Sequence, residues 1–170
     1  MTPPDTTRDA ARYSDENLGA FAAAWYRALD VHAPTEDLRA LLAPDGLQMI
    51  FPEKTLQGLG DFDAWYAGGT YGDGTTAPGV INLFLDENHT VLSVTVAERD
   101  ENEAVVDVVV GWQASWFVRP EAKSRRTSMN ATQRWTIRPA PEGRNPFGVV
   151  IAAYNATVKD FEYAPGFARL

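Results

Sequence analysis

The sequence predicts an α+β domain in which a cone-shaped, curved antiparallel sheet wraps around three N-terminal helices. Two long strands, residues 104–117 and 128–137, carry the clearest signal, and a polar turn that contains Pro120 joins them. Side chains alternate along a strand, so Val106 and Val108 lie on one wholly apolar face of the first strand. Helical periodicity is confined to the earlier part of the chain. Helices followed by antiparallel strands are typical of the α+β class.

Length and composition indicate one globular domain, residues 14–170, behind a flexible leader of residues 1–13. The chain has 170 residues, of which 45% are hydrophobic and 22% are charged. The net charge of −8 disfavours nucleic acid as a partner, because phosphate-binding proteins need a basic surface. The absence of cysteine excludes disulfides and thiolate catalysis. No apolar run is long enough for a membrane span and no signal peptide is visible, so we expect a cytoplasmic protein without a membrane partner.

Three helices are expected before the long strands. The first covers residues 14–31: Ser14 is placed to cap it, and the acidic residues that follow suit a helix N-terminus. Its apolar stripe contains Leu18, Phe21, Ala22, Trp25, Leu29 and His32. The second helix covers residues 36–43, and the third covers residues 62–67 and is stopped by Gly68.

The remaining strands are expected at residues 47–51, 55–58, 80–85, 89–98 and 148–161. In the strand of residues 89–98, simple alternation places Leu92, Val94 and Val96 on one face. The same alternation places His89 on the opposite face, away from the core, unless a β-bulge intervenes.

Two amides stand alone on otherwise apolar strand faces. Gln133 shares its face with Met129 and Ala131, and Asn155 is in phase with Ile151. A buried amide needs hydrogen-bond partners, which a ligand or the protein itself can supply. We expect an apolar pocket between the first helix and the late strands. Its expected ligand-binding residues are Trp25, Trp65, Tyr66, Trp112, Gln133, Trp135 and Asn155.

Several short motifs carry a family resemblance that spans nearly the whole chain from Ser14 to Tyr163. They are Trp25-Tyr26, Leu41-Leu42-Ala43-Pro44-Asp45-Gly46, Gly58, Phe62-Asp63-Ala64-Trp65-Tyr66, His89-Thr90-Val91 and Gln133-Arg134-Trp135-Thr136-Ile137. In these motifs the chain resembles the nuclear transport factor 2-like superfamily, in particular its SnoaL-like family. The resemblance implies a cystatin-like roll, an apolar pocket and a homodimer. It also implies a wide range of activities, so fold alone does not choose the function.

His89 is the natural candidate for acid/base chemistry, because imidazole exchanges protons near neutral pH. The resemblance to the dehydratases of the superfamily pairs His89 with Tyr26 of the first helix as catalytic residues. Those enzymes carry a second histidine on the next strand, where this chain has Val110-Gly111-Trp112-Gln113. The dehydratase assignment is therefore left open. The two histidines form no metal-binding spacing, and we expect neither a metal nor another cofactor.

Two functions are compatible with these residues. The first is a pocket protein of the SnoaL-like kind that binds a small apolar or aromatic molecule. It could act as a cofactor-free isomerase, lyase or hydrolase, although the sequence leaves open whether it is an enzyme. The second is a non-catalytic homodimeric binding or interaction module. The apolar Val105, Val109 and Phe117 on the nominally wet sheet face favour a homodimer through that face.

Overall fold

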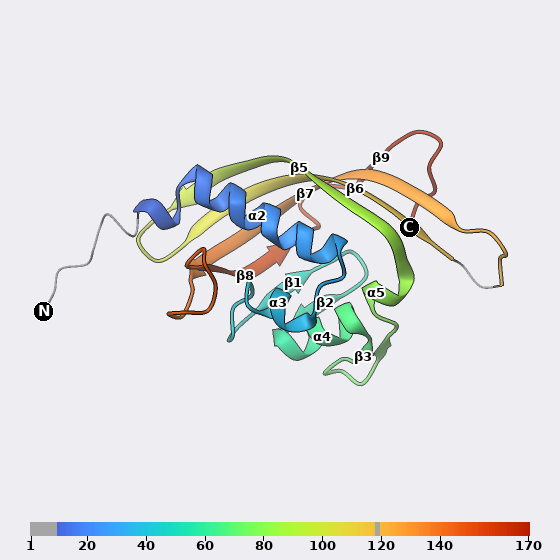
Figure 1. Ribbon diagram of the computed structural model, residues 1–170, viewed down its shortest axis with the longest axis horizontal. Helices are drawn as coiled ribbons and strands as arrows, with labels where there is room; N and C mark the ends of the chain where they lie inside the picture. The colour runs from blue at the N-terminus through green and yellow to red at the C-terminus, as the bar shows by residue number, and fades with distance from the viewer. Residues whose placement is uncertain (1–9, 118–119) are drawn as a thin grey trace, which may run out of the picture.

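The computed structural model describes residues 10–117 and 120–170 (Figure 1). Most of the expected leader, residues 1–9, lies outside the described residues. Residues 10–12 are helical, and Tyr13 is only 2% exposed and belongs to the hydrophobic core. The packed domain therefore includes Tyr13, one residue before the expected boundary.

Four helices follow, and they are α2 (Asp15–Asp30), α3 (Thr35–Arg39), α4 (Gly58–Ala67) and α5 (Val80–Leu83). The Ser14 hydroxyl caps α2 by accepting a hydrogen bond from the backbone N–H of Asn17 at 3.2 Å. The start of α4 is earlier than the sequence predicted, because Gly58 takes a φ of +80° and turns the chain into the helix. No helix in the described part of the chain is long and apolar enough to span a membrane.

The main sheet is curved and open, with the strand order β2-β1-β8-β7-β6-β5, and β9 pairs with β7. Its strands are β1 (Gln48–Ile50), β2 (Thr55–Gln57), β5 (Phe84–Arg99), β6 (Ala104–Trp116), β7 (Arg125–Pro139), β8 (Val149–Asn155) and β9 (Glu162–Tyr163). A separate small hairpin joins β3 (Gly69–Thr70) to β4 (Thr76–Ala77). The prediction of a wholly antiparallel sheet is wrong at one pair, since β1 runs parallel to β8. A three-residue strand carries too little pattern to reveal its direction.

The helices cover the concave face of the sheet (Figure 1). The helix α2 lies along β5 and contacts β7 through Phe21 and Trp135, and α4 lies against β2. The interface between α2 and the sheet is built from aromatic rings: Trp25, Phe21 and Trp135 are each at most 1% exposed. Such rings bury large areas and prefer tilted or edge contacts, as between Phe21 and Trp135 at 6.4 Å and 87°.

A β-bulge in β5 changes which residues face the core. The register with β6 shifts between Val91 and Ser93, so that Leu92 is 54% exposed. The prediction that Leu92 shares the inner face with Val94 is therefore wrong. His89 and Val91 are instead partly buried, on the side of the strand that faces α2. An extra residue reverses the alternation, and a sequence pattern of period two does not reveal where it occurs.

A second irregularity corrects the prediction for Asn155. The register of β7 with β8 shifts between Thr136 and Ile137, opposite Ala152. Beyond that point Tyr154, rather than Asn155, points into the core, and Tyr154 is 4% exposed. The Asn155 carboxamide oxygen accepts hydrogen bonds from the backbone N–H and the hydroxyl of Thr157, at 2.8 and 2.7 Å. Asn155 thus stabilises the turn after β8.

Candidate functional site

A histidine–aspartate pair joins the end of α2 to the start of β5. The Nδ1 atom of His89 lies 2.5 Å from Oδ1 of Asp30, and the backbone N–H of His89 donates to Oδ2 of the same carboxylate at 2.9 Å. Asp30 thus holds His89 by both its ring and its main chain. The side chains of His89 and Asp30 are 10% and 19% exposed, so the pair is screened from water yet reachable.

The carboxylate determines which nitrogen of the imidazole is free to act. A ring Nδ1–H that donates to Asp30 leaves the lone pair on Nε2, where it can accept a proton. The imidazolium that forms on proton capture lies directly against the negative carboxylate and is stabilised by it. An imidazole held in this way is able to act as a general base.

The ring of Tyr26, one helical turn before Asp30, packs against the imidazole of His89. The rings of Tyr26 and His89 stack with centroids 4.8 Å apart and an interplanar angle of 27°. The Tyr26 hydroxyl donates to Oε1 of Gln133 at 2.6 Å, and the indole N–H of Trp135 donates to the same oxygen at 3.1 Å. Burial raises the pKa of Tyr26 well above 10.0, with Tyr154 adding to the effect. Tyr26 therefore stays neutral, and its hydroxyl is directed into the core.

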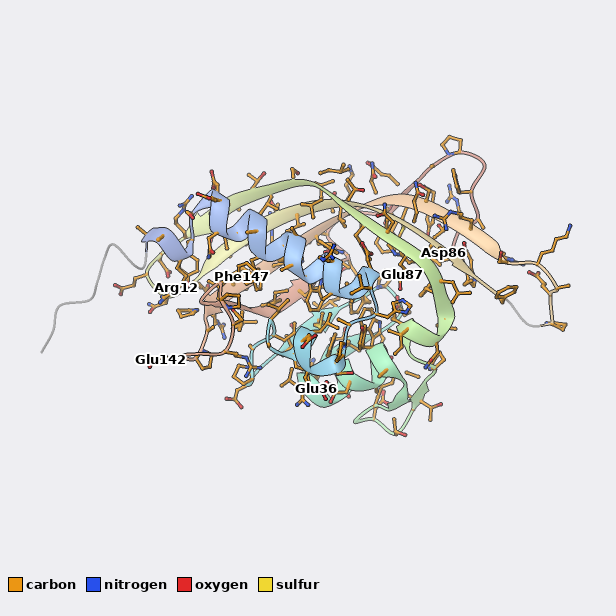
Figure 2. All side chains as sticks on the ribbon, in the orientation of Figure 1. Arg12, Glu36, Asp86, Glu87, Glu142 and Phe147 are labelled. Carbon is orange, nitrogen blue, oxygen red and sulfur yellow. The ribbon has the colours of Figure 1, made fainter. Side chains whose placement is uncertain are left out.

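A second carboxylate–histidine pair, Glu87 with His32, lies next to the first. Oε1 of Glu87 is 2.9 Å from Nε2 of His32, and Oε2 accepts the indole N–H of Trp112 at 3.1 Å. The Glu87 side chain is 3% exposed, and that of His32 is 27% exposed. Burial first, and the charge of Glu87 second, raise the pKa of Tyr66 to about 12. Figure 2 shows Glu87 where β5 bends beside the end of α2.

A hollow of about 990 Å³ opens near this end of the sheet. Its walls are mostly apolar, and they are formed by Pro52, Glu53, Trp65, Tyr71, Ala77, Pro78, Gly79, Val80, Leu83, Phe84, Ala156, Thr157, Lys159, Asp160, Phe161, Tyr163, Arg169 and Leu170. Phe84 also meets Trp112 edge to face, with centroids 5.1 Å apart. The hollow is therefore separated from His89 by a layer of aromatic side chains.

The predicted ligand-binding residues divide into three groups. Trp65 lines the hollow. Trp25, Trp135, Gln133 and Tyr66 are core residues instead: Trp25 is fully buried, and the Tyr66 hydroxyl donates to the carbonyl of Ala33 at 2.6 Å. Trp112 lies between His89 and Phe84, and Asn155 faces away from the core. The walls of the hollow thus include one of the seven predicted residues. In the described ranges, no cluster of three or more histidine, aspartate or glutamate side chains could hold a metal ion.

Sequence reasoning missed Asp30 and Glu87. A signal for Asp30 was present, because an acidic residue at the C-terminal end of a helix opposes the helix dipole. Asp30 also follows Tyr26 by four residues and so shares its face. For Glu87 the polar run of residues 86–88 concealed any signal, since such runs are usually solvent-exposed turns.

Comparisons with known proteins bear on the fold. No family model matches the chain, and no curated protein matches it. Among solved structures, a proposed scytalone dehydratase from Novosphingobium aromaticivorans has a TM-score of 0.61 and 14% identity, and the match covers 99% of this chain and 100% of that one. The hexachlorocyclohexane dehydrochlorinase LinA-type3 from Novosphingobium barchaimii has a TM-score of 0.60 and 11% identity, with 98% of each chain covered.

A nuclear transport factor 2-like superfamily protein from Salmonella enterica serovar Typhimurium is also similar. Its TM-score is 0.59 and its identity 13%, and the match covers 96% of this chain and 94% of that one. Identities this low establish the fold alone. The chain has the nuclear transport factor 2-like fold, as the sequence resemblance implied.

Replacing Gln133 by leucine should destabilise the protein by ~3 kcal/mol, because the hydroxyl of Tyr26 and the indole N–H of Trp135 both lose their acceptor inside the core. Gln48→Leu, at an exposed position of β1, is the matched control and should change the free energy of unfolding by less than about 0.5 kcal/mol. Urea unfolding of both variants measures the difference. Equal effects would show that Gln133 does not anchor the network.

Stability should fall as the pH rises from 10 to 12. Burial raises the pKa of Tyr154 to about 12, against a reference value of 10.0, although hydrogen bonds with Tyr26 and Gln133 oppose the shift. Above pH 10 the unfolded chain therefore binds fewer protons than the folded chain. The free energy of unfolding falls by ~3 kcal/mol as the pH rises through the pKa of Tyr154 in the folded chain. Tyr154→Phe should reduce the slope of the unfolding free energy against pH, while buried Tyr26 and Tyr66 keep their share of it, and Tyr163→Phe is the control. A slope that Tyr154→Phe leaves unchanged would contradict this assignment.

Proposed function

We propose that this chain is a small-molecule enzyme of the SnoaL-like kind that removes a proton from an apolar substrate without a cofactor. His89 is the general base, and Asp30 is the residue that orients it. The observation that carries the proposal is the 2.5 Å contact between His89 Nδ1 and the Asp30 carboxylate, reinforced by the main-chain hydrogen bond to the same group.

An elimination is the reaction that suits this arrangement best. His89 Nε2 takes a proton from a substrate carbon, the C–H electron pair becomes a C=C bond to the neighbouring carbon, and the leaving group departs from that carbon with its bonding pair. The charge that develops on the imidazole is balanced by Asp30. Two proteins of similar fold are described as a dehydrochlorinase and as a proposed dehydratase, and both names denote eliminations. An isomerisation would use the same first step and return the proton to another carbon.

The substrate is a small apolar or aromatic molecule. The hollow has a volume of about 990 Å³, which suits a ligand of this size, and aromatic side chains such as Trp65, Tyr71 and Phe161 form much of its wall. Tyr26 has a positioning role in this proposal, because its hydroxyl is engaged by Gln133 and its ring supports the imidazole. Trp25, Tyr66, Trp135 and Gln133 maintain the shape of the cone, behind the residues that meet the ligand.

A homodimer is the second part of the proposal. The alternative function, a non-catalytic interaction module, would also use a homodimer. The outer sheet face exposes Leu92 at 54%, and Phe117, directly after β6, is 49% exposed. Val105 and Val109 of β6 are partly exposed on the same face. Apolar area of this kind is stabilised by association with a second surface, and a second copy of the chain offers a complementary one.

Asp30→Asn and His89→Gln should each lower the rate of proton abstraction by about 10²–10⁴-fold, the usual contribution of an oriented general base. The assay uses a panel of cyclic compounds with a leaving group adjacent to an activated C–D bond, and it follows loss of deuterium and formation of the alkene. Asp45→Asn, at an exposed position of the loop before β1, is the matched control and should retain the wild-type rate. A panel that the wild type leaves unchanged, or a rate that survives His89→Gln, would refute the proposal.

Sedimentation should show a species of twice 18.7 kDa, since association covers the apolar outer face. Leu92→Lys places a charge in that face and should shift the equilibrium to the monomer. Val158→Lys replaces another exposed apolar residue, in the loop after β8, and should leave the dimer intact. A wild-type protein that sediments only as a monomer would refute the dimer.

A further inference from the structure

We infer that Glu87 is a positioning residue for Trp112, and that the indole of Trp112 decides which ligands pass from the hollow to His89. This inference rests on the proposed function of His89 and names the side chain that controls access to it. It concerns the pair of Glu87 with His32, which takes no part in the proton transfer itself. Asp30 already orients the base, and both of its oxygens are engaged by His89.

Glu87 is buried for a reason other than the orientation of the base. A carboxylate that is 3% exposed needs close partners, and each of its oxygens has one: His32 on Oε1 and the Trp112 indole on Oε2. His32 supplies a group that can carry the opposite charge, and Trp112 supplies a single N–H in a fixed direction. The pair with His32 thus keeps Glu87 in the one position from which it can hold the indole.

The backbone next to this pair is left-handed at two points. Among the non-glycine residues that the structure describes, those with positive φ are His32 at +49° and Asp86 at +52°. Aspartate and histidine adopt this conformation more readily than most residues. His32 directly follows the C-cap Val31 of α2, where a left-handed residue commonly ends a helix. These two turns bring the side chains of His32 and Glu87 together.

Trp112 occupies the space between the base and the hollow. It lies directly opposite His89 in the β5–β6 ladder, and the two ring centroids are 6.1 Å apart. On its other side it meets Phe84, whose side chain lines the hollow. A ligand that passes from the hollow to His89 by way of Phe84 therefore has to displace the indole.

The rings around His89 are tilted to one another. The imidazole makes an interplanar angle of 27° with Tyr26 and of 30° with Trp112. Both rings therefore lie against the imidazole, and Trp112 is the one of the two that also contacts Phe84 at the hollow.

Accessibility of His89 to a small reagent tests the inference without any substrate. The chain contains two histidines, so diethyl pyrocarbonate, which acylates neutral imidazole nitrogen, can be followed at each by peptide mass spectrometry. Trp112→Ala removes the indole, and Glu87→Leu removes its acceptor. Both should raise the rate of acylation at His89 by about tenfold, the factor that corresponds to one hydrogen bond. Glu87→Gln retains an acceptor for the indole and should keep the wild-type rate, as should Glu142→Leu in the distant loop before β8.

The indole N–H resonance of Trp112, identified by its loss in Trp112→Phe, gives a second readout. It should move strongly in Glu87→Leu and weakly in Glu87→Gln. If Glu87→Leu does not fold, Trp112→Ala and Glu87→Gln still decide the question. An unchanged acylation rate in Trp112→Ala, or equal rates in Glu87→Gln and a folded Glu87→Leu, would overturn the inference. Because acylation needs no turnover, an inert substrate panel would refute the proposed function and leave this result intact.

Discussion

The contact between the C-terminal end of α2 and the bent start of β5 is the constraint on which the candidate site depends. Two carboxylate–histidine pairs, Asp30 with His89 and Glu87 with His32, bridge these elements within a few residues of each other. Buried charges are tolerated only when they are paired, so each pair requires the helix and the strand to meet in this register. The bulges of β5 and the left-handed residues at His32 and Asp86 are the local adjustments that permit it.

The rest of the cone holds this contact rigid. Gln133 reaches from β7 to Tyr26, and the ring of Tyr26 in turn carries the imidazole of His89. The core therefore combines an apolar interface with one polar network whose members are side chains of distant elements. Such a network gives the helix a defined position on the sheet, because an apolar contact alone is less directional than a hydrogen bond. The proposed proton transfer by His89 needs the helix to keep this fixed position on the sheet.

The division between base and hollow gives the site its chemical character. His89 lies beside Trp112 and against the Asp30 carboxylate, and the hollow beyond Phe84 is bordered mostly by apolar side chains. Electrostatic interactions are stronger at such a partly buried pair than in water. Ligand affinity in the hollow would come chiefly from apolar contact, which has little direction of its own. Orientation of a ligand towards His89 must then come from the aromatic rings around the passage.

The sequence by itself determined the fold class, the first helix and the long central strands, because their periodicity is local and extends over many residues. It also indicated His89, since imidazole chemistry depends on residue type. Only the tertiary structure decided the rest of the site: Asp30 is 59 residues from His89 along the chain, and one bulge at Leu92 turns His89 towards the helix. Gln133 likewise found its partners within the protein, in Tyr26 and Trp135. Pairing between distant residues follows from strand register and helix position, and neither is encoded in a local pattern.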